Sequence, residues 1–114
     1  MVRILLVEDD DLVRGSLEYM LARVGHDVSP SSDATSALQL LSSASFDVLL
    51  TDINLPGRLD GMELAVWART AYPDMKIILM SGRHDLEQSA QELCAGAVFL
   101  KKPFGMADLG CLLE

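Results

Sequence analysis

The feature that most constrains the fold is a regular alternation of short apolar runs with longer stretches of helical periodicity. Largely apolar runs cover residues 3–7, 47–51, 75–80 and 97–100, and residues 26–29 are a candidate for one more, short strand. The helical stretches cover 12–24, 34–41, 62–72, 85–95 and 105–114. Five strand–helix repeats predict an α/β fold with a five-stranded parallel sheet, right-handed crossovers and helices on both faces. Such a doubly wound sheet carries its functional groups beyond the carboxyl ends of its strands.

Composition agrees with one buried sheet and limits the classes of function. The 114 residues suit a single domain, and the mean hydropathy of +0.27 suits a sheet covered on both faces. A net charge of −8 argues against direct nucleic-acid binding by this domain, since that requires a basic face. Cys94 and Cys111 form no metal-binding spacing and indicate a reducing compartment. With no signal peptide or membrane span in view, we expect a cytoplasmic protein.

The most informative strand end is Asp52. The apolar run Val48–Thr51 stops at this carboxylate, and the chain then turns at Pro56-Gly57. A carboxylate held at the end of a buried strand is partly shielded and rigidly placed. That environment suits a nucleophile or a metal ligand.

Two further acids, Glu8 and Asp9, follow the first strand. Adjacent carboxylates repel one another unless water or a cation neutralises them. Asp9, Asp52 and the backbone carbonyl of Asn54 make a plausible ligand set for Mg²⁺ (or Mn²⁺), with Glu8 acting through a bound water. The alternative is that these acids complement a helix N-terminus, and the acids at 10–11 are assigned to that role.

A hydroxyl and an ammonium group complete the predicted strand ends. Ser81 ends the fourth strand, and Lys102 follows the fifth strand before Pro103, while Lys101 should point to the other face. Taken singly, Ser81 could be an ordinary turn residue and Lys102 a solvated lysine. Taken together, a cation site, a carboxylate, a hydroxyl and a lysine at one sheet edge supply what phosphoryl transfer onto Asp52 requires.

These residues resemble the receiver domain of two-component response regulators. The similarity runs from about Val2 to Phe104, in the order of the family's motifs. The matching segments are Ile4–Asp10, Asp47–Gly57, Asp60–Leu64, Ile77–Gly82, Gly96-Ala97 and Phe99–Phe104.

The resemblance implies a flavodoxin-like (βα)5 receiver domain over residues 1–114, and a function in signal transduction. Asp52 would accept a phosphoryl group from a sensor histidine kinase or a histidine phosphotransfer protein. Glu8, Asp9 and the Asn54 carbonyl would hold Mg²⁺, and Lys102 would pair with the acceptor carboxylate and then with the phosphoryl group.

The resemblance also implies a conformational switch rather than a turnover enzyme. Ser81 would bind a phosphoryl oxygen and reorient, and the rotation of Phe99 would be coupled to it. The face built from the helix at 85–95, the strand at 97–100 and the helix at 105–114 would then change partners.

Three features depart from the commoner family pattern. The loop 56–61 is one residue longer, Phe99 lacks a tyrosine hydroxyl, and Arg83 lies two residues after Ser81. We expect Arg83 either to alter the lifetime of the phosphoryl group or to be an ordinary exposed residue. Pairing of Arg83 with Asp85 would be too local to matter.

Three other classes of protein fit parts of this sequence. A phosphatase of the haloacid-dehalogenase type would need Asp-x-Asp on the first strand, whereas this chain has Asp52-Ile53-Asn54 on the third. Asn54 cannot act as a general acid. An inactive receiver-like binding module would usually lack one of the five key residues, and no glycine-rich phosphate loop supports a nucleotide or flavin site. The effector is not identified, and the chain could be a stand-alone protein, a piece cut in or after its last helix, or a domain of a longer one.

Overall fold

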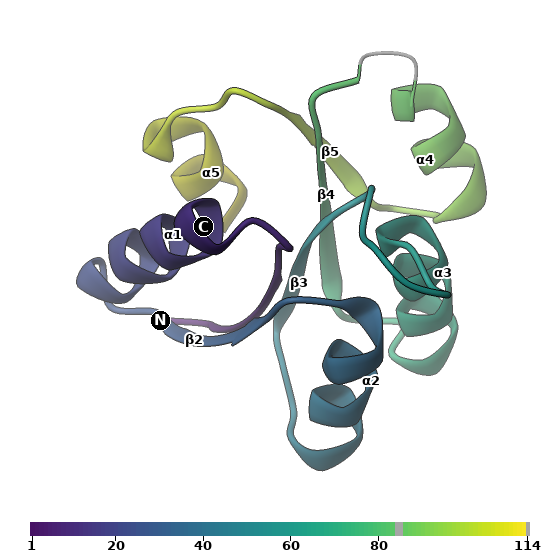
Figure 1. The fold of residues 1–114 in the computed structure, drawn as a ribbon, viewed down its shortest axis with the longest axis horizontal. Coiled ribbons are helices and arrows are strands. Elements are labelled where there is room, and N and C mark those ends of the chain that lie inside the picture. Colours follow the sequence, from purple (N-terminus) through teal and green to yellow (C-terminus); the bar gives the residue numbers. More distant parts are fainter. Residues whose placement is uncertain (84–85, 114) are drawn as a thin grey trace.

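A computed structural model describes residues 1–83 and 86–113 of the chain. Strands and helices alternate along it (Figure 1). In order they are β1 (Arg3–Val7), α1 (Asp11–Arg23), β2 (Asp27–Ser31), α2 (Ala34–Ser43), β3 (Val48–Asp52), α3 (Gly61–Ala71), β4 (Lys76–Ser81), α4 (Glu87–Leu93), β5 (Val98–Lys101) and α5 (Met106–Leu113).

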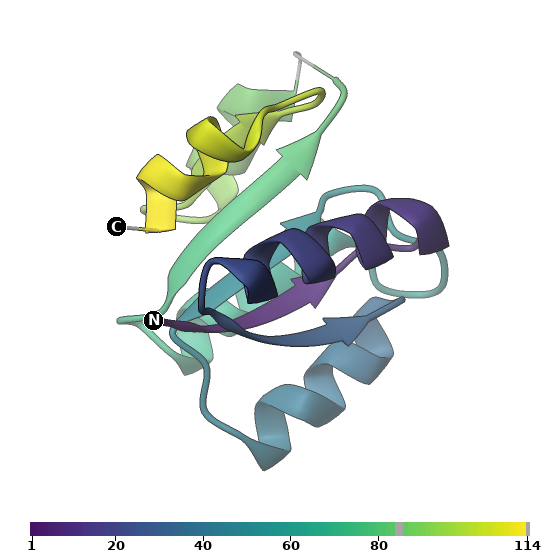
Figure 2. The same ribbon diagram turned by 90° about the vertical axis from the view of Figure 1, so that its left-hand side faces the viewer.

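The five strands form one parallel sheet in the order β2-β1-β3-β4-β5. Helices α1 and α5 lie on one face, in front of the sheet in Figure 2, and α2, α3 and α4 lie on the other. This is the predicted doubly wound fold. Because β3 is central, its carboxyl end is flanked by the ends of β1 and β4.

Each face of the sheet has its own apolar core, because successive side chains of a strand point to opposite faces. Leu5, Leu49 and Ile77 pack toward α2, α3 and α4. Their neighbours Ile4 and Leu50 pack toward α1 and α5. Strands β1, β3, β4 and β5 are therefore apolar almost throughout, which confines their polar groups to their ends.

The second strand and the last two helices differ in detail from the sequence-based expectation. The second strand is β2, Asp27–Ser31, which extends through Pro30 rather than stopping at residue 29. A proline is tolerated there because β2 is at the edge of the sheet, where no neighbouring strand needs its missing N–H.

The fourth helix is shorter than predicted. Helix α4 is Glu87–Leu93, and its N-cap residue Leu86 makes no side-chain capping bond. The predicted start at Asp85, together with His84 and Glu114, lies outside the described residues. Helix α5 begins at Met106 rather than at residue 105. Within residues 1–83 and 86–113, no helix has the length and apolar character needed to cross a membrane.

Candidate functional site

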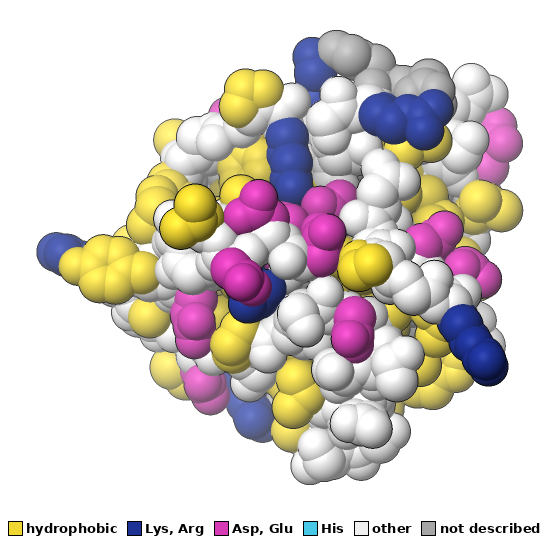
Figure 3. All heavy atoms as spheres, in the orientation of Figure 1, with side chains coloured by type: hydrophobic (Ala, Val, Ile, Leu, Met, Phe, Trp, Pro, Cys, Tyr) yellow, Lys and Arg dark blue, Asp and Glu magenta, His cyan; other side chains and the backbone are white. Residues whose placement is uncertain are grey.

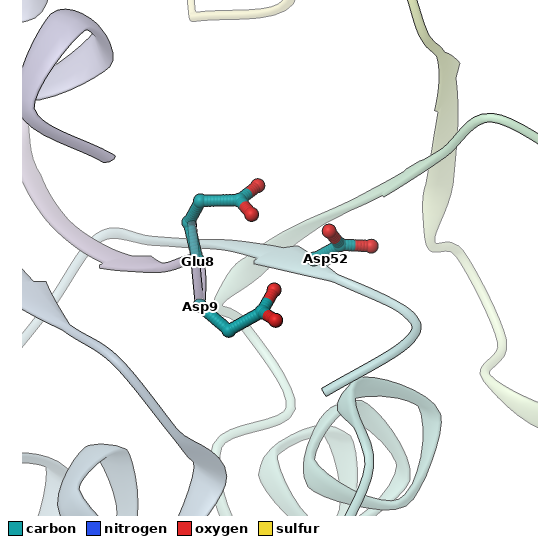
Figure 4. Close-up of side chains that lie close together, drawn as sticks. All are labelled: Glu8, Asp9 and Asp52. Atoms are coloured by element: carbon teal, nitrogen blue, oxygen red, sulfur yellow. The ribbon is translucent and has the colours of Figure 1, made fainter. Parts of the chain in front are cut away.

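Three carboxylates converge at the carboxyl edge of the sheet, as predicted. Glu8 and Asp9 follow β1, Asp52 ends β3, and one carboxylate oxygen from each lies within 4.8 Å of the others. Figure 4 shows the carboxylates of Glu8 and Asp9 projecting toward Asp52. Figure 3 shows acidic side chains gathered near the middle of the side of the molecule that faces the viewer. Glu8 and Asp52 are buried, whereas Asp9 is exposed.

Lys102 joins two of these acids. Its Nζ donates to Glu8 Oε2 at 2.8 Å and to Asp52 Oδ2 at 2.9 Å. The preceding residue, Lys101, is exposed, as its opposite orientation in the strand requires. The Lys102-Pro103 peptide bond is cis. The lysine predicted to pair with Asp52 therefore does so, and it also holds Glu8.

Burial and pairing act in opposite directions on the ionisable groups of the site. Burial raises the pKa of the Glu8 carboxyl above its ordinary value, although the hydrogen bonds from Lys102 and from the Asp10 backbone favour its charged form. Burial also opposes the charged form of Lys102. The hydrogen bonds to Glu8 and Asp52 outweigh that effect and raise the pKa of Lys102. The ammonium group thus stays charged and offsets the acidic cluster.

The backbone around Asp52 is closely packed. The Asn54 backbone N–H donates to Asp52 Oδ1 at 3.2 Å, and the Thr51 hydroxyl donates to the Asp52 carbonyl at 2.9 Å. At the start of α3, a Cβ added to Gly61 would lie 1.7 Å from that same carbonyl oxygen. Glycine at 61 is therefore needed for α3 to approach the acceptor strand this closely.

The N-terminus of α3 is fixed by a capping box. The Asp60 side chain accepts from the Glu63 backbone N–H, and the Glu63 side chain accepts from the Asp60 backbone N–H. Together with the Gly61 N–H, which donates to the Ile53 carbonyl at 2.7 Å, these bonds anchor the far end of the 53–60 loop. Asn54, in that loop, is exposed two residues beyond Asp52.

The fourth and fifth strands place the remaining predicted residues. Ser81 is buried at the end of β4, and its Oγ accepts from the Arg83 backbone N–H at 3.0 Å. Its carbonyl accepts from the Lys102 backbone N–H, which links β4 to the chain after β5. Phe99 is half-buried in β5, where it pairs in register with Leu79 and packs against the core beneath α2, α3 and α4. Arg83 is exposed.

Two residues beside the site were not identified from the sequence. Arg14 of α1 donates from Nη1 to the Glu8 carbonyl at 2.8 Å, and Gly61 makes the close approach to Asp52 described above. A basic residue one turn into the helix after the acidic strand end, and a glycine after the Asp60 cap, are the sequence signals that mark them. Asp10 caps α1 by accepting from the backbone N–H groups of Leu12 and Val13, as predicted.

The cluster suits a hard divalent cation. Its ligand atoms are carboxylate oxygens from Glu8, Asp9 and Asp52, the donor type that Mg²⁺ and Mn²⁺ prefer. Three acids so close together repel one another more than a single ammonium group can offset. The structure thus contains an acidic cluster that could bind a metal.

The sequence matches the family model for the response regulator receiver domain over residues 4–114. Among curated proteins, the chain is 32% identical over 114 residues to the transcriptional regulatory protein QseB of Haemophilus influenzae, covering 99% of this chain and 51% of QseB. It is 37% identical over 109 residues to the response regulator MprA of Mycobacterium ulcerans, covering 95% of this chain and 47% of MprA. The chain thus spans about half the length of these curated relatives.

Solved structures show the same architecture. A response regulator receiver domain protein from Clostridium thermocellum superposes with a TM-score of 0.89 at 27% identity, covering 99% of this chain and 91% of that one. The response regulator TrrA of Thermotoga maritima, solved in complex with Mg²⁺-BeF, superposes with a TM-score of 0.89 at 26% identity, covering 99% and 96%. These likenesses confirm the predicted fold, a doubly wound sheet of five parallel strands with five helices.

Proposed function

Because the chain belongs to the response regulator receiver domain family, we propose that Asp52 is its phosphoacceptor and that Glu8, Asp9, Ser81 and Lys102 serve the transfer. The observation that carries this assignment is the double contact of Lys102 with Asp52 and Glu8 at the carboxyl edge of the sheet. Within the acidic cluster, Asp52 is the member that ends the central strand; like Glu8, it is held by Lys102 and by a backbone N–H. We propose that phosphorylation of Asp52 switches the conformation of the domain, and that the domain does not turn over a free substrate.

The chemical step is an attack by the Asp52 carboxylate on a phosphohistidine. One carboxylate oxygen forms a bond to phosphorus while the phosphorus–nitrogen bond of the donor breaks, and its electron pair returns to the imidazole. Lys102 offsets the negative charge of the acceptor and then of the bound phosphoryl group. The Ser81 hydroxyl, which accepts from the Arg83 N–H, donates a hydrogen bond to a phosphoryl oxygen.

Glu8, Asp9, Asp52 and the backbone carbonyl of Asn54 are the residues that would hold Mg²⁺ (or Mn²⁺). Both Glu8 oxygens are already engaged, since Oε1 accepts from the Asp10 N–H and Oε2 from Lys102. That supports a Glu8 contact through water rather than direct ligation. When bound, the cation supplies positive charge that stabilises the negative oxygens of the transferring group.

The switch is proposed to spread from Ser81 to the face formed by α4, β5 and α5. Ser81 is joined to the end of β5 through the bond from the Lys102 N–H, and Phe99 lies in the adjacent strand. A new charge at Asp52 favours whichever arrangement brings the Ser81 hydroxyl toward it. We assign Arg83, two residues beyond Ser81, to modulation of the phosphoryl lifetime.

The donor is proposed to be a sensor histidine kinase or a histidine phosphotransfer protein, acting in the cytoplasm. The chain spans about half the length of QseB and MprA, and no effector is assigned to the switch. The receiver domain itself is proposed to bind neither nucleic acid nor membranes, in keeping with its net charge of −8.

Intact-mass spectrometry tests this function. The protein is incubated with a small phosphodonor such as acetyl phosphate, with Mg²⁺ or with EDTA. Asp52→Asn is treated in the same way, and Asp47→Asn, at an exposed position just before β3, is the control. We expect one phosphoryl adduct that requires Mg²⁺ and is absent from Asp52→Asn. If no adduct forms, beryllium fluoride with Mg²⁺ is tried as a stable mimic. The proposal fails if the wild type acquires no adduct and beryllium fluoride leaves its structure unchanged.

A further inference from the structure

We propose that Arg14 is a positioning residue for the metal-binding acids: its guanidinium fixes the backbone between β1 and α1 so that Glu8 and Asp9 face Asp52. This inference rests on the proposed function, since it concerns how that site is assembled. It also assigns a specific role to a residue on α1 that belongs neither to the phosphoacceptor nor to its cation ligands.

The contact is direct and directional. Arg14 Nη1 donates to the Glu8 backbone carbonyl at 2.8 Å, while Nη2 donates to Asp11 Oδ1 at 2.5 Å. The Arg14 side chain is 21% exposed, so its bond to Glu8 is partly shielded from water, whereas Asp11 is 86% exposed. The exposed ion pair with Asp11 contributes little on its own, but it fixes the guanidinium plane that faces Glu8.

The backbone of Glu8 is held by hydrogen bonds at both its N–H and its carbonyl. Its N–H donates to the Ser31 carbonyl of β2 at 3.0 Å, and its carbonyl accepts from Arg14. Removing Arg14 leaves the bond to Ser31 but frees the peptide plane that leads into Asp9. That plane is where the chain leaves the sheet to enter α1.

The position of the Asp9 carboxylate depends most on the hydrogen bond from Arg14 to the Glu8 carbonyl. This carboxylate is exposed and, within the described part of the chain, accepts no hydrogen bond. Its position near Asp52 therefore follows from the backbone alone. Groups that orient metal ligands from outside the first shell typically change metal affinity by about 10- to 100-fold when removed. Arg14 acts through a backbone carbonyl, so we expect the low end, about tenfold.

The sign of the effect separates positioning from simple electrostatics. Arg14 is a cation, and removing a cation beside a cation-binding site should by itself strengthen metal binding. A positioning role predicts the opposite, weaker binding. A matched control exists on the same helix: Arg23 carries the same charge but is exposed and contacts Tyr19, at the other end of α1.

The test is calorimetric titration of metal-free protein with Mg²⁺, comparing wild type, Arg14→Met, Arg14→Lys and Arg23→Met. Methionine keeps the apolar stem of Arg14 without its donors, and lysine keeps one donor and the charge. We expect a Mg²⁺ dissociation constant about tenfold higher in Arg14→Met, within about threefold of wild type in Arg14→Lys, and unchanged in Arg23→Met. If Arg14→Met does not fold, Arg14→Gln, whose amide is too short to reach the Glu8 carbonyl, replaces it.

Phosphorylation by acetyl phosphate provides a second readout. At saturating Mg²⁺, the rate in Arg14→Met should return to within about twofold of wild type, because positioning alters affinity and leaves Asp52, Lys102 and Ser81 in place. Unchanged or tighter Mg²⁺ binding in Arg14→Met would overturn the inference. A wild-type protein that takes no phosphoryl group and whose structure beryllium fluoride leaves unchanged would instead refute the proposed function, and the Mg²⁺ titrations would still decide the role of Arg14.

Discussion

Replacing Lys102 by methionine should destabilise the metal-free protein. The substitution removes both ion pairs at the site and leaves Glu8 and Asp52, whose side chains are only 2% and 12% exposed, without their shared cation. Breaking a buried ion pair by removing one partner typically costs about 3–5 kcal/mol. Because the Lys102 side chain is 27% exposed and water can reach part of the gap, we expect the low end, about 3 kcal/mol.

The assay is urea unfolding in EDTA, with thermal unfolding alongside. A loss of about 3 kcal/mol corresponds to a fall in Tm of roughly 12 °C for a domain of this size, at about 4 °C per kcal/mol. Lys101→Met is the matched control, since Lys101 is adjacent and exposed, and it should change the free energy of unfolding by less than about 0.5 kcal/mol.

Addition of Mg²⁺ extends this prediction. In the variant, a bound cation would take over charge neutralisation that Lys102 provides in the wild type. Mg²⁺ should therefore raise the Tm of Lys102→Met by more than it raises that of the wild type. Equal stability of Lys102→Met and the wild type in EDTA would refute the view that Lys102 offsets the repulsion among these acids.

Three further predictions concern the pH dependence, the packing and the charge of the site. The raised pKa of Lys102 means that its stabilisation is complete below about pH 10.4 and is lost as the pH rises through the folded-state pKa. Unfolding free energies measured between about pH 9 and 12 should therefore fall by less in Lys102→Met than in the wild type, and identical profiles would count against this reasoning. Gly61→Ala should lower the free energy of unfolding, measured in urea, by about 3 kcal/mol, since its Cβ would meet the Asp52 carbonyl. Gly15→Ala, in open space within α1, should raise it by about 0.5–1 kcal/mol. Equal effects of the two substitutions would refute the close approach of Gly61 to Asp52. Asp9→Asn should stabilise the metal-free protein by about 1 kcal/mol, because it relieves the repulsion between Asp9 and the other two acids of the cluster. It should also weaken Mg²⁺ binding measured by calorimetry. A loss of stability in EDTA would contradict this prediction.

The sheet and the residues at its carboxyl edge were predictable because their signals are local. A buried strand is marked by an apolar run, Asp52 is the first charged residue after one such run, and Ser81 is the first polar residue after another. Parallel pairing then brings the carboxyl ends of the strands to the same edge of the sheet, independently of the conformation of the loops. The convergence of Glu8, Asp9 and Asp52 follows from that rule alone.

The contacts between distant residues could not be predicted in the same way. That Lys102 binds Glu8 as well as Asp52 depends on the relative positions of β1, β3 and the end of β5, which no single segment encodes. The bond from Arg14 to Glu8 depends on how α1 leaves the sheet. The inclusion of Pro30 in β2 depends on its edge position, because the same residue in a central strand would remove a ladder hydrogen bond.

The most direct test of the central claim is to locate the modified residue chemically. Protein treated with acetyl phosphate and Mg²⁺ is reduced with borohydride, which converts an aspartyl phosphate to homoserine, and the peptides are then sequenced by mass spectrometry. We predict homoserine at Asp52, and unmodified Glu8 and Asp9. A reduced residue at Glu8, Asp9 or any carboxylate other than Asp52 would contradict the assignment of the phosphoacceptor.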